Sequence, residues 1–184
     1  MPIRGAGAVA AGLAILSVMF LSVAAWNGFP LIFYDTGAYI LEGLGHVFLV
    51  ERAPVYADLL FLAGGDFSLW PIVILQALMI SYLILEVARA EVPGLSLLGL
   101  SMIGAGLSLF TGIGWYAGQV EPDIFTPMVI LGCWLLLVRG HQLGKAGLCW
   151  VLGRTALAVA DHPAHLGLQG GLLISAVAVK LARR

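Results

Sequence analysis

Residues 68–88 read SLWPIVILQALMISYLILEVA, and this stretch decides the fold because it contains a single charged residue, Glu86. A helix needs about 20 mostly apolar residues to cross the hydrocarbon core of a bilayer. Pro71 is compatible with the first turn of such a helix, where its missing N–H would have no intrahelical acceptor. The stretch therefore predicts a transmembrane helix.

The composition of the whole chain indicates the same environment. Of 184 residues, 61% are hydrophobic and 10% are charged, and the mean hydropathy is +1.02. A soluble domain has about 25% charged residues, so this chain could not cover a water-facing surface. The net charge of −1 shows no basic footprint, and we expect no nucleic-acid partner. Cys133 and Cys149 lie in apolar runs without metal-ligand spacing, and we assign no metal ligand to them.

Other apolar runs lie on both sides of this stretch, at residues 8–26, 94–117, 124–138, 146–160 and 166–179. The run 8–26 could be a signal peptide, but its length and the lack of a small-residue cleavage site favour an uncleaved helix. The last run is short and rich in Gly and Ala. We therefore predict an all-α, polytopic membrane protein with five to six transmembrane helices in a single membrane domain, residues 1–184.

The basic residues fix the predicted orientation. If the N-terminus is cytoplasmic, nearly all Lys and Arg outside the spans fall on the cytoplasmic side, as the positive-inside rule requires. These residues are Arg4, Arg89, Arg139, Lys145, Lys180, Arg183 and Arg184. Most acidic residues fall on the outer side, which topology does not require.

The segment 27–67 forms the first outer loop in this arrangement. Residues 36–50 (TGAYILEGLGHVFLV) and 54–63 (PVYADLLFLA) are apolar, but the second is too short to cross a bilayer. We predict two interfacial helices along the outer membrane surface, followed by a turn at Gly64-Gly65.

Polar clusters occupy three outer loops: Tyr34-Asp35 with Tyr39, residues 119–123 (QVEPD) and residues 161–165 (DHPAH). Such carboxylates can act as a general base for a hydroxyl group or as ligands of a divalent cation. Asp35, Asp123 and Asp161 could equally cap the helices that follow them. Arg154 lies inside an apolar run, where a charge usually has a partner such as Asp161 or a lipid phosphate.

The order of these segments is similar to the start of GT-C membrane glycosyltransferases, including lipid A aminoarabinose transferases and protein O-mannosyltransferases. The segments that carry the resemblance are YDTGAYI (34–40), RAPVYADLLFL (52–62), the run 68–89 and EPDIF (121–125). It covers residues 8–138, which would correspond to the N-terminal module of such an enzyme. The lysine and paired prolines of the family are reduced here to Arg52-Ala53-Pro54.

The resemblance implies transfer of a sugar from a polyprenyl-phosphate donor at the outer face of the bacterial inner (cytoplasmic) membrane. It makes Asp35 the candidate catalytic base. The predicted substrate-binding residues are Tyr34, Tyr39, Arg52, Tyr56, Glu121, Asp123, His162 and His165. Glu121 and Asp123 would orient the acceptor, or bind a divalent cation as in members that use one. Arg52 and the loop 161–165 would lie near the lipid phosphate.

The alternative hypothesis is a non-catalytic small membrane subunit or assembly factor of a larger membrane complex. It predicts no outer cavity and an exposed groove of small residues that receives a helix of a partner membrane protein. The candidate residues for that groove are Gly104, Gly106, Gly112 and Gly114.

Overall fold

The computed structural model describes residue 3 and residues 5–45, 54–160 and 163–182. Within these ranges every secondary-structure element is a helix. The one isolated β-bridge joins Leu31 to Gln119. The predicted all-α class is confirmed. The helices are α1 (Ala6–Phe20), α2 (Ser22–Asn27), α3 (Thr36–Gly45), α4 (Pro54–Leu62), α5 (Trp70–Glu91), α6 (Leu97–Phe110), α7 (Ile113–Ala117), η1 (Pro122–Ile124), α8 (Phe125–Val138), η2 (Gly140–Gln142), α9 (Lys145–Ala160) and α10 (Pro163–Ala182).

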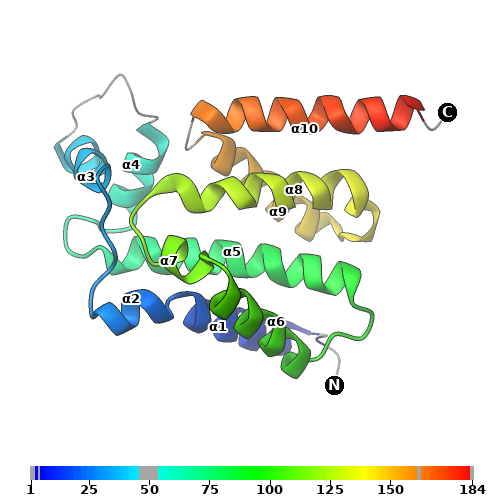
Figure 1. Ribbon diagram of the computed structural model, residues 1–184, viewed down its shortest axis with the longest axis horizontal. Helices are drawn as coiled ribbons and strands as arrows, with labels where there is room; N and C mark the ends of the chain where they lie inside the picture. The colour runs from blue at the N-terminus through cyan, green and yellow to red at the C-terminus, as the bar shows by residue number, and fades with distance from the viewer. Residues whose placement is uncertain (1–2, 4, 46–53, 161–162, 183–184) are drawn as a thin grey trace.

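Helix α5 lies in the middle of the bundle, between α1 on one side and α8 on the other (Figure 1). Helix α6 packs on α1, while α9 and α10 pack on α8. Half of the apolar side chains of α5 are buried and most of the others are half-buried, as expected for a helix in the middle of a bundle that is hydrophobic on nearly all sides. A hydrogen bond of 3.1 Å between the Ser17 and Ser81 hydroxyls joins α1 to α5 within this core.

Successive long helices run in alternating directions, so the molecule has two distinct ends (Figure 1). At one end the Ile3 N–H donates to the Leu95 carbonyl, 2.8 Å away, and an Arg139 guanidinium nitrogen lies 2.8 Å from a Glu91 carboxylate oxygen. We call this the basic end, because the helix ends here carry Arg89, Arg139 and Lys145. The opposite hairpin end comprises α3, α4, the loops 28–35 and 118–124, and the start of α10.

Each of the predicted apolar runs contains a helix, but two of the runs are interrupted. The run 8–26 corresponds to α1 and α2, which are separated at Leu21. The run 94–117 divides into α6 and α7 because Thr111 has an extended backbone, with φ −133° and ψ 169°. The last helix, α10, is longer than the predicted run 166–179 and begins at Pro163, a residue suited to a helical first turn.

The predicted outer loop contains two short helices, α3 and α4, which pack against each other. Helix α3 is described as far as Gly45, and residues 46–53 lie outside the described part of the chain. Helix α4 ends near the predicted turn, where Gly64 has a φ of +85° that favours glycine. Gly43 allows the α4 backbone to approach closely, because a Cβ there would lie 2.5 Å from the Ala57 carbonyl oxygen.

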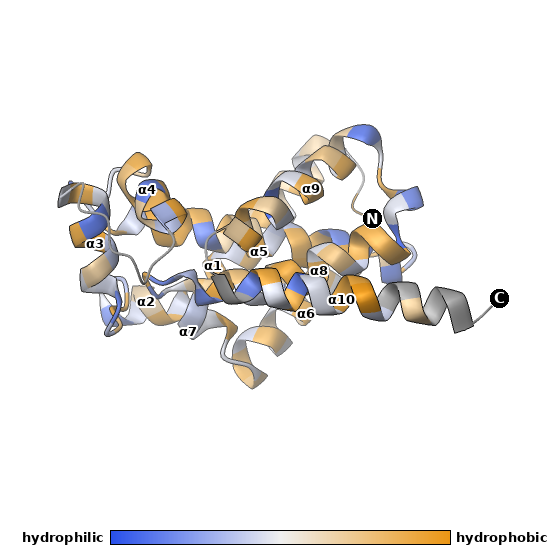
Figure 2. Cartoon of the chain, turned by 90° about the horizontal axis from the view of Figure 1, so that it is seen from above, coloured by the Kyte–Doolittle hydropathy of each residue, from blue (hydrophilic) through white to orange (hydrophobic). Residues whose placement is uncertain are grey.

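Most of the described helices are shorter than the hydrocarbon core of a bilayer is thick. Among them, only α5 is both long and apolar enough to cross a bilayer by itself. Helix α6 has 14 residues, which at 1.5 Å per residue gives a rod of about 21 Å, shorter than a hydrocarbon core of about 30 Å. Hydrophobic residues nevertheless extend over the outward faces of α6 and α9 (Figure 2), including the exposed Leu98, Met102 and Trp150.

Small residues mediate close contacts between the long helices. Gly12 of α1 faces Leu100 of α6, and Gly104 of α6 faces Leu16 and Met19 of α1. Among the other glycines expected to line an open groove, Gly114 lies against Val23 and Gly112 lies beside Tyr116, whereas Gly106 has open space around it. Most of these small residues therefore have neighbours within the chain itself.

Candidate functional site

The loop before α3 and the loop before α8 are held together at the hairpin end. The Leu31 N–H donates to the Gly118 carbonyl at 2.8 Å, and the Val120 N–H donates back to the Leu31 carbonyl at 2.9 Å. The Thr36 hydroxyl at the start of α3 also donates to the Val120 carbonyl, at 2.9 Å. Two of the polar loops selected from the sequence are therefore neighbours in the fold.

A buried chain of hydrogen bonds connects these loops to α4 and α5. The Tyr56 hydroxyl donates to Gln76 Oε1 at 2.6 Å, and Gln76 Nε2 donates to the Gln119 carbonyl at 2.8 Å. Tyr56 is fully buried, with its ring edge-on to Tyr39 at a centroid distance of 4.9 Å. In this arrangement, Tyr39 and Tyr56 support the loops from inside the protein. Their predicted contact with substrate would require them to become exposed.

The third polar loop lies next to the second. His165, near the start of α10, is buried, and its Nε2 lies 2.8 Å from the Thr126 hydroxyl at the start of α8. The other ring nitrogen, Nδ1, lies 2.5 Å from the Ala158 carbonyl near the end of α9. This histidine therefore joins three helices at the hairpin end.

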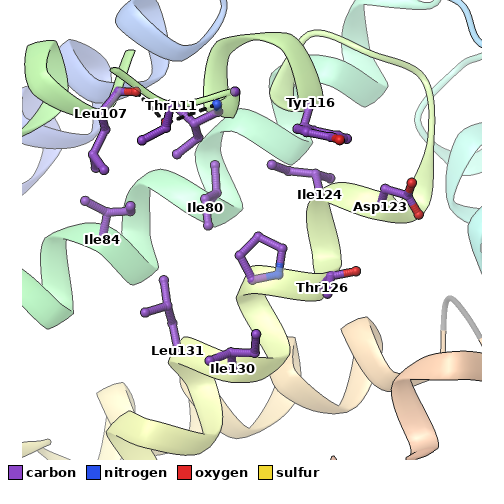
Figure 3. A pocket seen from close by; sticks show the side chains of 13 residues that line it. Ile80, Ile84, Leu107, Thr111, Tyr116, Asp123, Ile124, Thr126, Ile130 and Leu131 are labelled. Carbon is purple, nitrogen blue, oxygen red and sulfur yellow. Dashed lines mark hydrogen bonds between the residues drawn. The ribbon is translucent and has the colours of Figure 1, made fainter. Parts of the chain in front are cut away.

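A cavity of about 600 Å³ opens between α5, the α6–α7 segment and α8. Its walls are mainly aliphatic, and its polar residues lie largely toward the hairpin end. The lining residues are Ile80, Ile84, Leu107, Thr111, Gly112, Ile113, Tyr116, Asp123, Ile124, Thr126, Pro127, Ile130 and Leu131. Figure 3 shows the Asp123 carboxylate and the Thr126 hydroxyl on the same side, both pointing away from Ile84 and Leu131. We refer to this cavity as the apolar groove.

The predicted acidic residues differ in how they are placed. Asp123 is exposed and lines the apolar groove, whereas Glu121, two residues earlier, is buried. Asp35 is half-buried immediately before α3, where its backbone carbonyl accepts hydrogen bonds from the N–H groups of Ala38 and Tyr39. Asp35 thus occupies a capping position, and it does not line the groove.

The remaining predicted site residues are distributed as follows. Tyr34 is 91% exposed on the surface. Arg52 and His162 lie outside the described residues, so their predicted position near a lipid phosphate stays a prediction. In the part of the chain that the structure describes, no three His, Cys, Asp or Glu side chains gather closely enough to hold a metal ion.

Arg154 has aromatic neighbours that the sequence prediction did not include. Its guanidinium carbon lies 3.9 Å from the centre of the Tyr82 ring and 5.0 Å from the centre of the Trp150 ring. Such contacts between a cation and an aromatic face are favourable, and more so away from water. One guanidinium nitrogen, Nη1, is buried and has no hydrogen-bond partner among the described residues. Asp161, the partner suggested by the sequence, lies outside them.

Two important polar residues were not selected from the sequence. Gln76 could have been found, because an amide in the middle of an apolar run requires a buried hydrogen-bond partner. Thr126 carried no such signal, since its partner His165 is 39 residues away along the chain.

Comparisons with models of protein families, with curated proteins and with solved structures find no match to this chain. The functional conclusion therefore depends on the geometry of the hairpin end and the apolar groove.

Proposed function

We propose that this chain is a GT-C-like membrane glycosyltransferase, or the N-terminal module of one, that uses a polyprenyl-phosphate-linked sugar. The observation that carries the proposal is the apolar groove, which is aliphatic along its walls and has Asp123 at its hairpin end. An isoprenoid chain needs such an apolar channel, and its sugar needs a polar end where carboxylates are within reach.

In this proposal five to six apolar segments cross the bacterial inner membrane, with the basic end in the cytoplasm and the hairpin end outside. Arg89, Arg139 and Lys145 support that orientation, because short cytoplasmic loops are enriched in Lys and Arg. Helices α3 and α4 would lie along the outer surface. Exposed aromatic residues there, such as Trp26, Tyr34 and Phe67, suit the membrane interface.

The proposed reaction transfers the sugar to a hydroxyl acceptor. The oxygen of the acceptor hydroxyl attacks the anomeric carbon of the sugar while the Asp35 carboxylate accepts the hydroxyl proton. The bond between the anomeric carbon and the phosphate oxygen breaks, which releases polyprenyl phosphate. Glu121 and Asp123 orient the acceptor or bind a divalent cation that offsets the phosphate charge. The hydrogen bond from Thr36 to the Val120 carbonyl supports this division of roles, because it holds the two loops that carry these acids together.

Binding of a fluorescent polyprenyl phosphate to the full chain in nanodiscs tests the proposal. The Ile84→Trp substitution would fill the apolar groove, and we expect it to weaken binding by at least about tenfold. That factor requires only about 1.4 kcal/mol, less than the burial of two methylene groups contributes. Leu98→Trp, on the exposed face of α6, is the matched control and should bind as the wild type does.

The chemistry needs a second measurement. Asp35→Asn should still bind polyprenyl phosphate but should no longer release it from a polyprenyl-phosphate mannose or aminoarabinose donor. Equal binding by the wild type and Ile84→Trp, with both proteins folded by circular dichroism, would argue against the groove as the lipid site. Undiminished release by Asp35→Asn would remove Asp35 as the base.

A further inference from the structure

The contact between His165 and the Ala158 carbonyl places a proton on one of the two ring nitrogens of His165. A backbone carbonyl oxygen can only accept a hydrogen bond, so the 2.5 Å contact with the Ala158 carbonyl requires a proton on His165 Nδ1. In the neutral ring, Nε2 is then an acceptor. To this neutral ring the Thr126 hydroxyl, 2.8 Å away, donates its proton at Nε2. This is the arrangement in which an imidazole activates a hydroxyl nucleophile, with the ring oriented by a third group.

Thr126 also occupies a position where an activated hydroxyl could meet a substrate. The residue is half-buried and lines the apolar groove, and its hydroxyl points away from the aliphatic walls, to the same side as the Asp123 carboxylate (Figure 3). An ester carbonyl would therefore have to lie at the hairpin side of the groove, with its alkyl chain along the walls. Thr126 belongs to the first turn of α8, where the helix dipole favours negative charge. A carbonyl oxygen that becomes negative during attack by Thr126 would benefit from this field.

We infer that Thr126 and His165 form a nucleophile–base pair that takes the acyl group of a lipid ester whose chain lies in the apolar groove. This activity goes beyond the proposed sugar transfer, because the reacting atom is a carbonyl carbon. Thr126 Oγ1 bonds to that carbon, and its proton passes to His165 Nε2. The ester C–O bond then breaks, and the alcohol leaves with the proton from Nε2.

The acyl group is released by the reverse sequence of proton movements. Water, or the hydroxyl of an acceptor, attacks the carbonyl carbon of the acyl-threonine while His165 Nε2 accepts its proton. The bond to Oγ1 breaks, and Thr126 recovers its proton from Nε2. The aliphatic walls around Ile84 and Leu131 would select esters with long alkyl chains over short ones.

The competing explanation is that the bond between Thr126 and His165 only fastens α10 to α8. A purely structural hydroxyl would not react covalently, so the test is labelling of the full chain in nanodiscs by a hexadecyl fluorophosphonate. Such a reagent forms a bond to an activated hydroxyl and releases fluoride. We expect one adduct per chain, located on Thr126 by mass spectrometry, and slower labelling by a short ethyl reagent.

Variants separate the two explanations. Thr126→Val should abolish the adduct, Thr126→Ser should retain it, and His165→Gln should slow its formation by about 10²- to 10⁴-fold because the base is lost. Ser175→Ala removes an exposed hydroxyl of α10 that donates to the Gly171 carbonyl of the same helix, and it should not change labelling. Helix content measured by circular dichroism verifies that each variant is folded.

The inference is overturned if folded wild-type protein gives no adduct at Thr126, or if His165→Gln is labelled as fast as the wild type. Binding of polyprenyl phosphate does not require a nucleophile. Absent labelling with intact lipid binding would therefore refute the acyl-transfer activity alone and leave the proposed sugar transfer standing.

Discussion

Removing the Tyr56 hydroxyl should destabilise the protein by a measurable and predictable amount. Tyr56→Phe takes away the donor 2.6 Å from Gln76 Oε1, and Gln76 is fully buried. The amide cannot turn round to compensate, because its Nε2 already donates to the Gln119 carbonyl at 2.8 Å. A buried acceptor left without a donor costs about 1–3 kcal/mol, which corresponds to a factor of about 5–150 in the unfolding equilibrium.

The assay is equilibrium unfolding of the detergent-solubilised chain, followed by far-ultraviolet circular dichroism. Tyr34→Phe is the matched control, because the Tyr34 side chain is 91% exposed, and such a substitution should change stability by less than about 0.5 kcal/mol. If Tyr56→Phe proved as stable as Tyr34→Phe, the hydrogen-bonded chain from α4 to the loop before α8 would not stabilise the hairpin end.

Other predictions concern packing and orientation. Gly104→Leu should destabilise the protein by about 1–3 kcal/mol, because even a Cβ at Gly104 would meet side chains of α1. Gly106 has open space around it, so Gly106→Ala should be close to neutral in the same unfolding assay. In a chain whose native cysteines are replaced, the Asp66→Cys variant should react with a membrane-impermeant maleimide in intact spheroplasts. The Gln142→Cys variant should react only after permeabilisation. The reverse result would invert the proposed topology.

The sequence predicts the helices well because each is an apolar run bounded by recognisable residues. Pro71 and Pro163 lie at helix starts, and Gly64 and Gly94 supply turns with positive φ. The interruption near Thr111 is harder to foresee. A lone threonine-glycine pair is common in membrane helices, and the extended backbone there becomes apparent only in the folded chain.

The sequence predicts the candidate site less completely, since a site depends on contacts between distant residues. Selecting polar loop residues identifies Asp123 and His165 as candidates. It does not reveal that the hydroxyl bonded to His165 belongs to Thr126, or that Gln76 connects Tyr56 to the loop before α8. Those pairings depend on how α5, α8 and α10 pack side by side, which hydropathy along the chain does not specify.

Burial divides the polar residues of the hairpin end into two sets, and this division refines their proposed roles. Tyr39 and Tyr56 are buried, which suits residues that hold the loops in place. Asp123 and Thr126 remain at least partly accessible beside the apolar groove, where a ligand can reach them without unfolding the hairpin end. Because the hydrogen bonds of Gln76 and Thr36 tie the two loops together, a substitution in the buried set should affect the accessible set indirectly, through its position. A substitution at the exposed Asp123 should instead change ligand chemistry while leaving the fold intact. At Thr126 only Thr126→Ser separates function from stability, because it keeps the hydroxyl that is bonded to the buried His165.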